Sequence, residues 1–133
     1  MIVMSELLLS GRRMLVVEDE MMLLIMIEDM LSDLGCQSVS VAATVKQALA
    51  LVGTRPFDIA MLDVNLNGEM SFQVADALVS LHVPFIFSSG YGADALTSKY
   101  YDRPLLRKPY SYHDLENVLQ RVCADGTGGR RRV

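Results

Sequence analysis

The sequence has few cysteines, little positive charge and no long apolar run, and each absence excludes a class of protein. Its two cysteines, Cys36 and Cys123, form no CxxC pair and lie near no histidine at metal-ligand spacing, so we expect small buried hydrophobic side chains. The densest apolar run, Met21 to Ile27, is far shorter than the roughly 20 residues that span a bilayer. Residues 1–9 lack the basic region and cleavage site of a secretory signal. We therefore expect a cytoplasmic protein with no membrane contact.

The charge balance is acidic, with 12 Lys and Arg against 16 Asp and Glu and a net charge of −4. A general nucleic-acid binder needs excess basic side chains to replace the counterions of phosphates, so we expect no direct DNA binding. Residues 13–124 have the size of one domain, after an extension at residues 1–12. We interpret residues 125–133, a glycine-rich segment ending in Arg130 to Arg132 and Val133, as a flexible tail too short for an output domain.

Short apolar segments alternate with longer amphipathic ones along the chain. The expected strands are residues 14–17, 37–41, 57–62, 85–87 and 105–106, and the expected helices are residues 21–34, 44–52, 71–81 and 111–122. Residues 91–101, between the last two strands, are poor helix material. This alternation predicts an α/β fold, a five-stranded parallel sheet of order 2-1-3-4-5 with helices on both faces. The second strand alternates polar and apolar residues, as an edge strand does.

Local patterns predict where the helices begin and which face they bury. The start signals are two capping boxes and one N-cap serine: Thr44 with Gln47, Ser111 with Asp114, and Ser71. Gly35 is expected to stop the first helix. The expected core stripe of that helix is Leu23, Ile27, Met30 and Leu34. Its additional apolar residues indicate either an unusually apolar core helix or a surface for a partner: Met21, Met22, Leu24, Ile25 and Met26.

Polar side chains follow four of the expected strands at their carboxyl ends, where open parallel sheets bind ligands. They are Glu18 and Asp19, then Asp63, then Ser89, then Lys108. Three carboxylates at one edge repel each other, and a divalent cation relieves that repulsion. Oxygen ligands that are few in number suit Mg²⁺, which shares its shell with water and phosphate. A carboxylate nucleophile, a cation, a lysine and a hydroxyl are what phosphoryl transfer requires.

Four motifs in this order resemble those of the bacterial response-regulator receiver domains, which have a flavodoxin-like fold. They are residues 16–20 (Val-Val-Glu-Asp-Glu), residues 62–66 (Leu-Asp-Val-Asn-Leu), Ser89-Gly90 and Lys108-Pro109. The resemblance implies that Asp63 accepts a phosphoryl group from a histidine kinase. It implies that Lys108, before a cis proline bond, pairs with the phosphoryl oxygens, and that Ser89 hydrogen-bonds to them and draws its loop inward.

The same resemblance implies a Mg²⁺ cofactor held by four groups. Asp19 and Asp63 would ligate the ion directly, Glu18 would act through water, and the backbone carbonyl of Asn65 would complete the protein ligands. Receivers use the first helix, beside the loop after the fifth strand, to dock the kinase. The chain would then be a single-domain response regulator that signals by protein–protein interaction or drains phosphate from a kinase. It would be no enzyme beyond catalysing its own phosphorylation and dephosphorylation.

A narrower resemblance is to the stand-alone receivers nicknamed FAT GUY, which are partners of the HWE class of histidine kinases. It depends on residues 87–91 (Phe-Ser-Ser-Gly-Tyr), 103–105 and 108–110. Ser88 and Ser89 stand where these receivers have Ala and Thr. Leu105 replaces the aromatic residue that most receivers carry three residues before the lysine. We therefore expect switching by ordering of residues 91–101 rather than by aromatic rotation.

Two other functions compete with this interpretation. An aspartyl phosphatase on a similar sheet typically has a second acid two residues after the nucleophile, and Asn65 at that position counts against it. A pseudo-receiver would bind partners without phosphorylation, and the intact Glu18, Asp19, Asp63 and Lys108 count against that alternative. Asp58, at the start of its strand, is expected to be a surface or turn residue.

Overall fold

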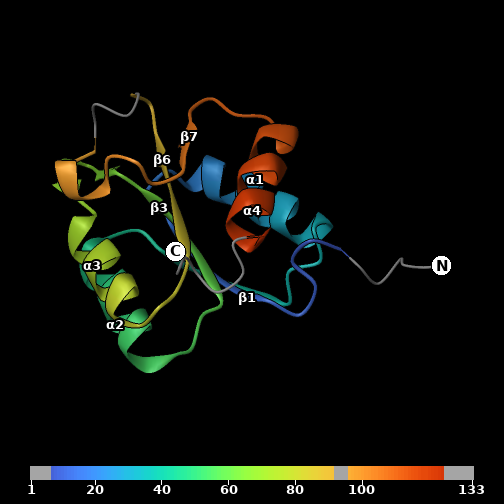
Figure 1. Ribbon diagram of the computed structural model, residues 1–133, viewed down its shortest axis with the longest axis horizontal. Coiled ribbons are helices and arrows are strands. Elements are labelled where there is room, and N and C mark those ends of the chain that lie inside the picture. Colours follow the sequence, from blue (N-terminus) through green and yellow to red (C-terminus); the bar gives the residue numbers. More distant parts are fainter. Residues whose placement is uncertain (1–6, 92–95, 125–133) are drawn as a thin grey trace.

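The computed structural model describes residues 7–91 and 96–124, which fold around one parallel β-sheet (Figure 1). The sheet has the order β2-β1-β3-β6-β7, which confirms the predicted order 2-1-3-4-5. Its strands are β1 (Arg13–Val17), β2 (Ser38–Ala42), β3 (Ile59–Asp63), β6 (Phe85–Ser89) and β7 (Leu105–Arg107). All four pairings in the sheet are parallel. The carboxyl ends of the strands therefore meet at one edge.

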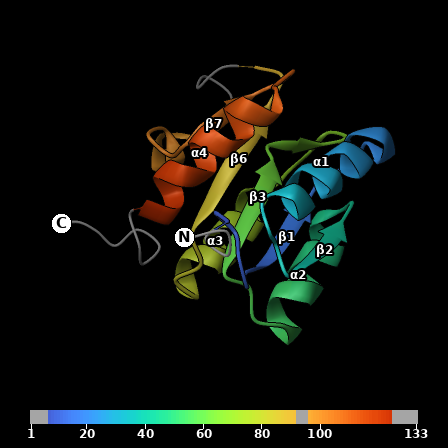
Figure 2. The same ribbon diagram turned by 90° about the vertical axis from the view of Figure 1, so that its right-hand side faces the viewer.

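Helices cover both faces of the sheet, as predicted (Figures 1 and 2). The helices α1 (Met21–Asp33) and α4 (Tyr112–Ala124) pack on one face, and α2 (Val45–Thr54) and α3 (Phe72–Ser80) pack on the other. The described part of the crossover from β6 to β7 contains one 3-10 turn, η2 (Ser98–Tyr100). Residues 92–95 of this crossover lie outside the described residues, so the predicted ordering of residues 91–101 stays a prediction.

Alternate residues along each inner strand build two separate hydrophobic layers. In β1, Leu15 and Val17 face α2 and α3, whereas Met14 and Val16 face α1 and α4. A strand buried on both faces must be apolar at every position, which explains the uniform runs in the sequence. In contrast, β2 is exposed or half-buried at its first four positions, which agrees with its place at the edge.

The two predicted capping boxes form. The Thr44 hydroxyl accepts a hydrogen bond from the Gln47 N–H at 3.1 Å, and the Gln47 side chain accepts one from the Ala43 N–H at 2.8 Å. The Ser111 hydroxyl and the Asp114 carboxylate accept hydrogen bonds from each other's backbone N–H groups, both at 3.0 Å. These side chains satisfy donors that the first helical turn leaves without a backbone partner.

Two predictions about helix faces and caps were wrong. Ser71 precedes α3, but its hydroxyl is fully buried and finds no hydrogen-bond partner among the described residues. The buried stripe of α1 is Leu24, Ile27 and Leu31, continued by Leu34, so Leu23 and Met30 lie at its half-buried margin. Because residues 21–27 are all apolar, the first half of α1 does not define a buried face by itself, and packing on the sheet selects it.

Asn67 and Gly68 form the turn of a small hairpin that the sequence interpretation treated as a loop. Its strands are β4 (Asn65–Leu66) and β5 (Glu69–Met70), paired antiparallel. Both turn residues have positive φ, 55° and 94°, which Asn-Gly pairs adopt readily. The Asn-Gly pair was the signal that could have predicted this hairpin, which begins two residues after Asp63.

Two further contacts stabilise the edge of the sheet at which the strands begin. Asp58 accepts hydrogen bonds from the Arg13 backbone N–H at 2.8 Å and from both ends of its guanidinium at 3.0 and 3.1 Å. It therefore links the starts of β1 and β3 rather than serving only as a turn residue. Leu9 is fully buried, and its N–H donates to the Leu34 carbonyl at 2.8 Å. The chain before β1 thus packs against the end of α1.

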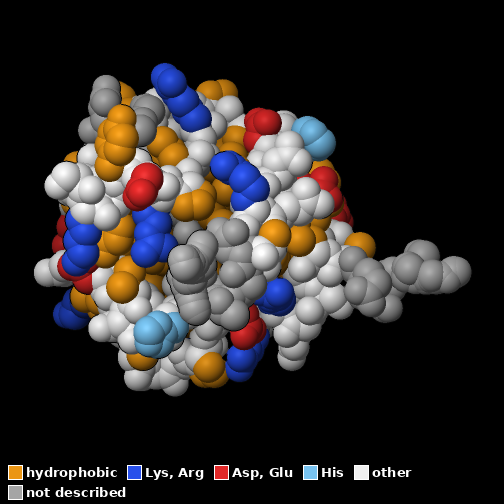
Figure 3. Space-filling view, in the orientation of Figure 1, with side chains coloured by type: hydrophobic (Ala, Val, Ile, Leu, Met, Phe, Trp, Pro, Cys, Tyr) orange, Lys and Arg blue, Asp and Glu red, His pale blue; other side chains and the backbone are white. Residues whose placement is uncertain are grey.

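Lys and Arg side chains are dispersed over the face shown in Figure 3, with Asp and Glu among them.

Cys36 and Cys123 are free and half-buried, each packed against the layer that contains α1 and α4. No helix in the described ranges has the length and hydropathy that a membrane span requires.

Candidate phosphoacceptor site

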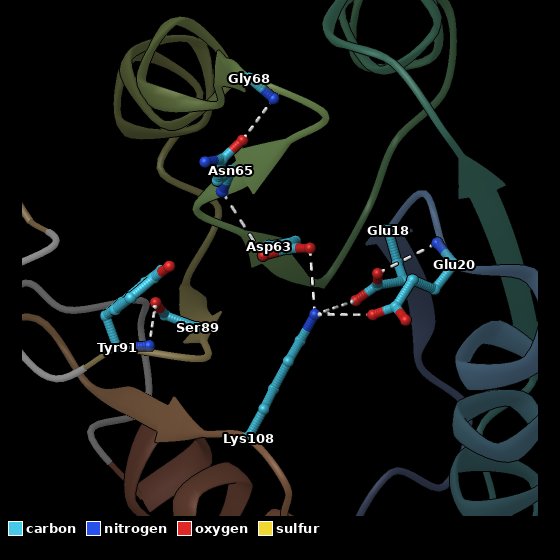
Figure 4. A network of polar contacts seen from close by, with 8 residues as sticks. All are labelled: Glu18, Glu20, Asp63, Asn65, Gly68, Ser89, Tyr91 and Lys108. Atoms are coloured by element: carbon cyan, nitrogen blue, oxygen red, sulfur yellow. Dashed lines mark hydrogen bonds and ion pairs between the residues drawn. The ribbon is translucent and has the colours of Figure 1, made fainter.

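The polar residues predicted at the strand ends come together at the carboxyl edge of the sheet (Figure 4). Glu18 directly follows β1, Asp63 ends β3, Ser89 ends β6, and Lys108 directly follows β7. The parallel register places Asp63 opposite Ser88, so Ser89 extends one residue beyond it. The sheet topology therefore assembles groups that are up to 90 residues apart into one cluster.

Three carboxylates form the centre of this cluster. Glu18, Asp19 and Asp63 each present one oxygen, and these oxygens all lie within 4.8 Å of one another. Glu18 is 1% exposed and Asp63 is 6% exposed, whereas Asp19 is half-buried. A cluster of hard oxygen ligands that solvent reaches from one side fits Mg²⁺, which keeps several waters when bound.

Lys108 neutralises part of this charge. Its Nζ lies 3.0 Å from Glu18 Oε1, 3.1 Å from Asp63 Oδ2 and 3.6 Å from Glu20 Oε1 (Figure 4). Burial lowers the pKa of Lys108, but its hydrogen bonds to Glu18 and Asp63 outweigh that effect and raise it. The backbone N–H of Lys108 donates to the Ser89 carbonyl at 2.8 Å, and the Lys108–Pro109 peptide bond is cis. The ammonium is thus charged and anchored beside the Asp63 carboxylate.

The surroundings of Glu18 disfavour its ionised form. Burial raises its pKa to about 7, the hydrogen bond with Lys108 opposes this rise, and the negative charge of Asp63 adds to it. Its Oε2 accepts a hydrogen bond from the Glu20 N–H at 3.2 Å. The carboxylate cluster therefore favours an additional positive charge, and binding a divalent cation would favour the ionised form of Glu18.

Ser89 and Asn65 flank Asp63, with Ser89 on the opposite side from Glu18 (Figure 4). The Ser89 hydroxyl is buried and accepts a hydrogen bond from the Tyr91 N–H at 2.9 Å, which leaves its own proton free to donate. The Asn65 N–H donates to Asp63 Oδ1 at 3.4 Å. The Gly68 N–H donates to Asn65 Oδ1 at 2.6 Å, so the Asn65 side chain turns toward the hairpin turn while its backbone N–H faces Asp63 (Figure 4).

The sequence interpretation missed two features around this site. One is Glu20, whose exposed carboxylate reaches Lys108. The other is Tyr100, which is buried in the hydrophobic layer between the sheet and the helices α2 and α3, and Leu105 packs against the same layer. Leu105 pairs with Phe87 in the sheet, and the Tyr100 ring lies 5.6 Å from the Phe87 ring. An aromatic side chain is therefore present in this region, supplied by η2 rather than by β7.

A sequence model of the response regulator receiver domain matches residues 14–120. The chain therefore belongs to the response regulator receiver domain family. A search among curated proteins gave no match. The chain is 39% identical to SdrG from Sphingomonas melonis Fr1, with a TM-score of 0.74 over 85% of this chain and 95% of that one.

Two further solved structures are similar. The BeF3-activated conformation of SdrG from Pseudomonas melonis Fr1 is 38% identical, with a TM-score of 0.72 over 88% of this chain and 97% of that one. The receiver domain of sensor histidine kinase PA1611 from Pseudomonas aeruginosa PAO1 has a magnesium ion coordinated in its active site cleft. It is 25% identical, with a TM-score of 0.67 over 84% of this chain and 97% of that one.

Proposed function

We propose that this receiver takes a phosphoryl group from a histidine kinase onto Asp63. The observation that carries the proposal is the position of the Asp63 carboxylate, buried at the end of β3 beside Glu18 and Asp19 and in contact with the Lys108 ammonium. An Asp63 oxygen attacks phosphorus, the P–N bond of the phosphohistidine breaks, and an acyl phosphate forms while the imidazole regains a proton. Lys108 and the Ser89 hydroxyl donate hydrogen bonds to the phosphoryl oxygens as they gain charge.

The cofactor in this proposal is Mg²⁺. Asp19 and Asp63 would ligate it directly, Glu18 would act through water, and the Asn65 backbone carbonyl would be the remaining protein ligand. When bound, the ion supplies positive charge to the phosphoryl oxygens and to the acidic cluster. The mutual proximity of the three carboxylates and the magnesium ion seen in the PA1611 receiver support this assignment.

The exposed apolar face of α1 supports a partner contact. Met21, Met22, Ile25 and Met26 are between 50% and 78% exposed, whereas Leu24 is buried. The core-helix interpretation is therefore wrong for these four residues. Flexible methionine side chains adapt to partner surfaces. We assign this face to the histidine kinase, and the resemblance at residues 87–91 favours the HWE class. Signalling then proceeds by protein–protein interaction, or by removal of phosphate from the kinase.

Amide NMR spectra of the full chain, titrated with Mg²⁺ and then beryllium fluoride, test this proposal. Beryllium fluoride stands in for the phosphoryl group on the aspartate. We expect shifts centred on Asp19, Asp63, Ser89 and Lys108 in the wild type, and no beryllium fluoride response in Asp63→Asn. If the wild type responds to neither reagent at millimolar concentration, the chain is a pseudo-receiver that binds partners without phosphorylation.

A further inference from the structure

Among the described residues, Lys108 has one carboxylate neighbour that belongs to neither the proposed metal ligands nor the proposed phosphoacceptor. Glu20 Oε1 lies 3.6 Å from Lys108 Nζ, beyond the 3.0 and 3.1 Å contacts with Glu18 and Asp63. The Glu20 side chain is 67% exposed, whereas those of Glu18 and Asp63 are 1% and 8% exposed. Figure 4 shows Glu20 on the same side of Lys108 as Glu18. The ammonium is therefore shared between two buried carboxylates and one at the rim.

The backbone holds Glu20 in this position without using its side chain. Glu20 is the residue before α1, and its N–H donates to Glu18 Oε2 at 3.2 Å. Its carboxylate makes no capping hydrogen bond with the helix. The Glu20 carboxylate is therefore available to contact Lys108. A substitution of the Glu20 side chain leaves the hydrogen bond from the Glu20 N–H to Glu18 in place.

This inference rests on the proposed function, because Mg²⁺ and a phosphoryl group change which carboxylates remain available to Lys108. A cation ligated by Asp19 and Asp63, with Glu18 acting through water, would share the negative charge of these carboxylates and repel the ammonium nearby. Of the described carboxylates that contact Lys108, Glu20 is then the one that keeps its full charge. We propose that Glu20 is the resting partner of Lys108 and sets how tightly the site holds an anionic phosphoryl group.

The size of the effect follows from the exposure of Glu20. Phosphoryl oxygens must replace Glu20 as the partner of Lys108 before they gain its hydrogen bonds. An ion pair with one exposed partner changes an equilibrium by about two- to fivefold, and salt reduces it further. Removing the Glu20 charge should therefore tighten phosphoryl binding by about two- to fivefold at low ionic strength.

The experiment compares the wild type with Glu20→Gln and with Glu28→Gln. Glu28 is an exposed acid two turns along α1, so its substitution removes the same charge at a greater distance from Lys108. The dissociation constant of beryllium fluoride is measured by NMR at saturating Mg²⁺ in low and high salt. The Lys108 side-chain resonances are recorded in the Mg²⁺-bound form, because a structural role alone would not move them.

We expect Glu20→Gln to bind beryllium fluoride about two- to fivefold more tightly in low salt and to shift the Lys108 resonances before beryllium fluoride is added. Glu28→Gln should do neither. Equal affinities in all three proteins, or the same gain in both variants, would overturn the role of Glu20 while leaving Asp63 as the acceptor. A wild type that binds neither Mg²⁺ nor beryllium fluoride would overturn the proposed function as well.

Discussion

Tyr100 is the residue through which η2 is anchored to the rest of the fold, and its substitution tests that anchor. The side chain is 2% exposed. Its ring stacks on Phe72 at 6.1 Å with an interplanar angle of 9° and meets Phe85 edge-on at 6.0 Å. Its hydroxyl donates a hydrogen bond to the Asp76 carboxylate on α3. Burial, and then this hydrogen bond, raise the pKa of Tyr100 to about 12.

Two substitutions separate the contributions of the Tyr100 hydroxyl and the Tyr100 ring to the free energy of unfolding. Tyr100→Phe removes the hydrogen bond, but the Asp76 side chain is 53% exposed and keeps Lys99 at 2.9 Å, so no buried charge is left without a partner. We expect a loss of about 1 kcal/mol in the free energy of unfolding. Tyr100→Ala also removes a buried ring and leaves a cavity, for a total of about 4 kcal/mol.

Urea unfolding followed by circular dichroism measures both values from the midpoints, provided that the slope of the transition is unchanged. Tyr101→Phe is the matched control, because the neighbouring Tyr101 is 60% exposed and should lose almost nothing. Two results would contradict this role of Tyr100: the same midpoint for Tyr100→Phe and Tyr101→Phe, or a loss of stability in Tyr100→Ala no greater than in Tyr100→Phe. Either result would mean that η2 is not anchored by this ring.

Two further predictions concern Glu18 and Gly35. Because burial raises the pKa of Glu18 to about 7, the native state keeps a proton that the unfolded chain releases near pH 4.5. Without Mg²⁺, its ionisation should therefore cost stability as pH rises from about 4.5 to 7, on the order of 3 kcal/mol, and chemical unfolding of Glu18→Gln should lack this loss. Gly35 has φ +90°, and an added Cβ would lie 2.8 Å from the Leu7 Cβ. Gly35→Ala should lower the free energy of unfolding by more than about 1 kcal/mol, and an unchanged thermal midpoint would contradict this.

The order of strands and helices could be predicted because its signals are local. Apolar runs of four or five residues, the two capping boxes and Gly35 each depend on neighbours within a few residues. The location of the site could be predicted for a related reason. In a parallel sheet, every residue that directly follows a strand reaches the same edge, so Asp63 and Lys108 were expected to meet although they are 45 residues apart.

Other features could not be predicted because they depend on the distances between elements. The phase of α1 was predicted wrongly because its first seven residues are all apolar, and such a segment has no defined buried face until it packs on a sheet. The partner of Asp58 is likewise not evident from its local sequence, since Arg13 is 45 residues away. Ser71 has a capping residue type, yet its hydroxyl is buried without forming the cap.

The residue types at the strand ends can be read from the amino-acid sequence, and they already imply that carboxylates, a hydroxyl and an ammonium meet at one edge. How these groups share their charges depends on the packing of the folded chain. Whether Lys108 contacts Glu20 as well as Glu18 depends on the path of the chain between the end of β1 and the start of α1. Ion pairs and pKa shifts change steeply over a few ångströms and with burial, and the pattern of residue types does not specify distances on that scale.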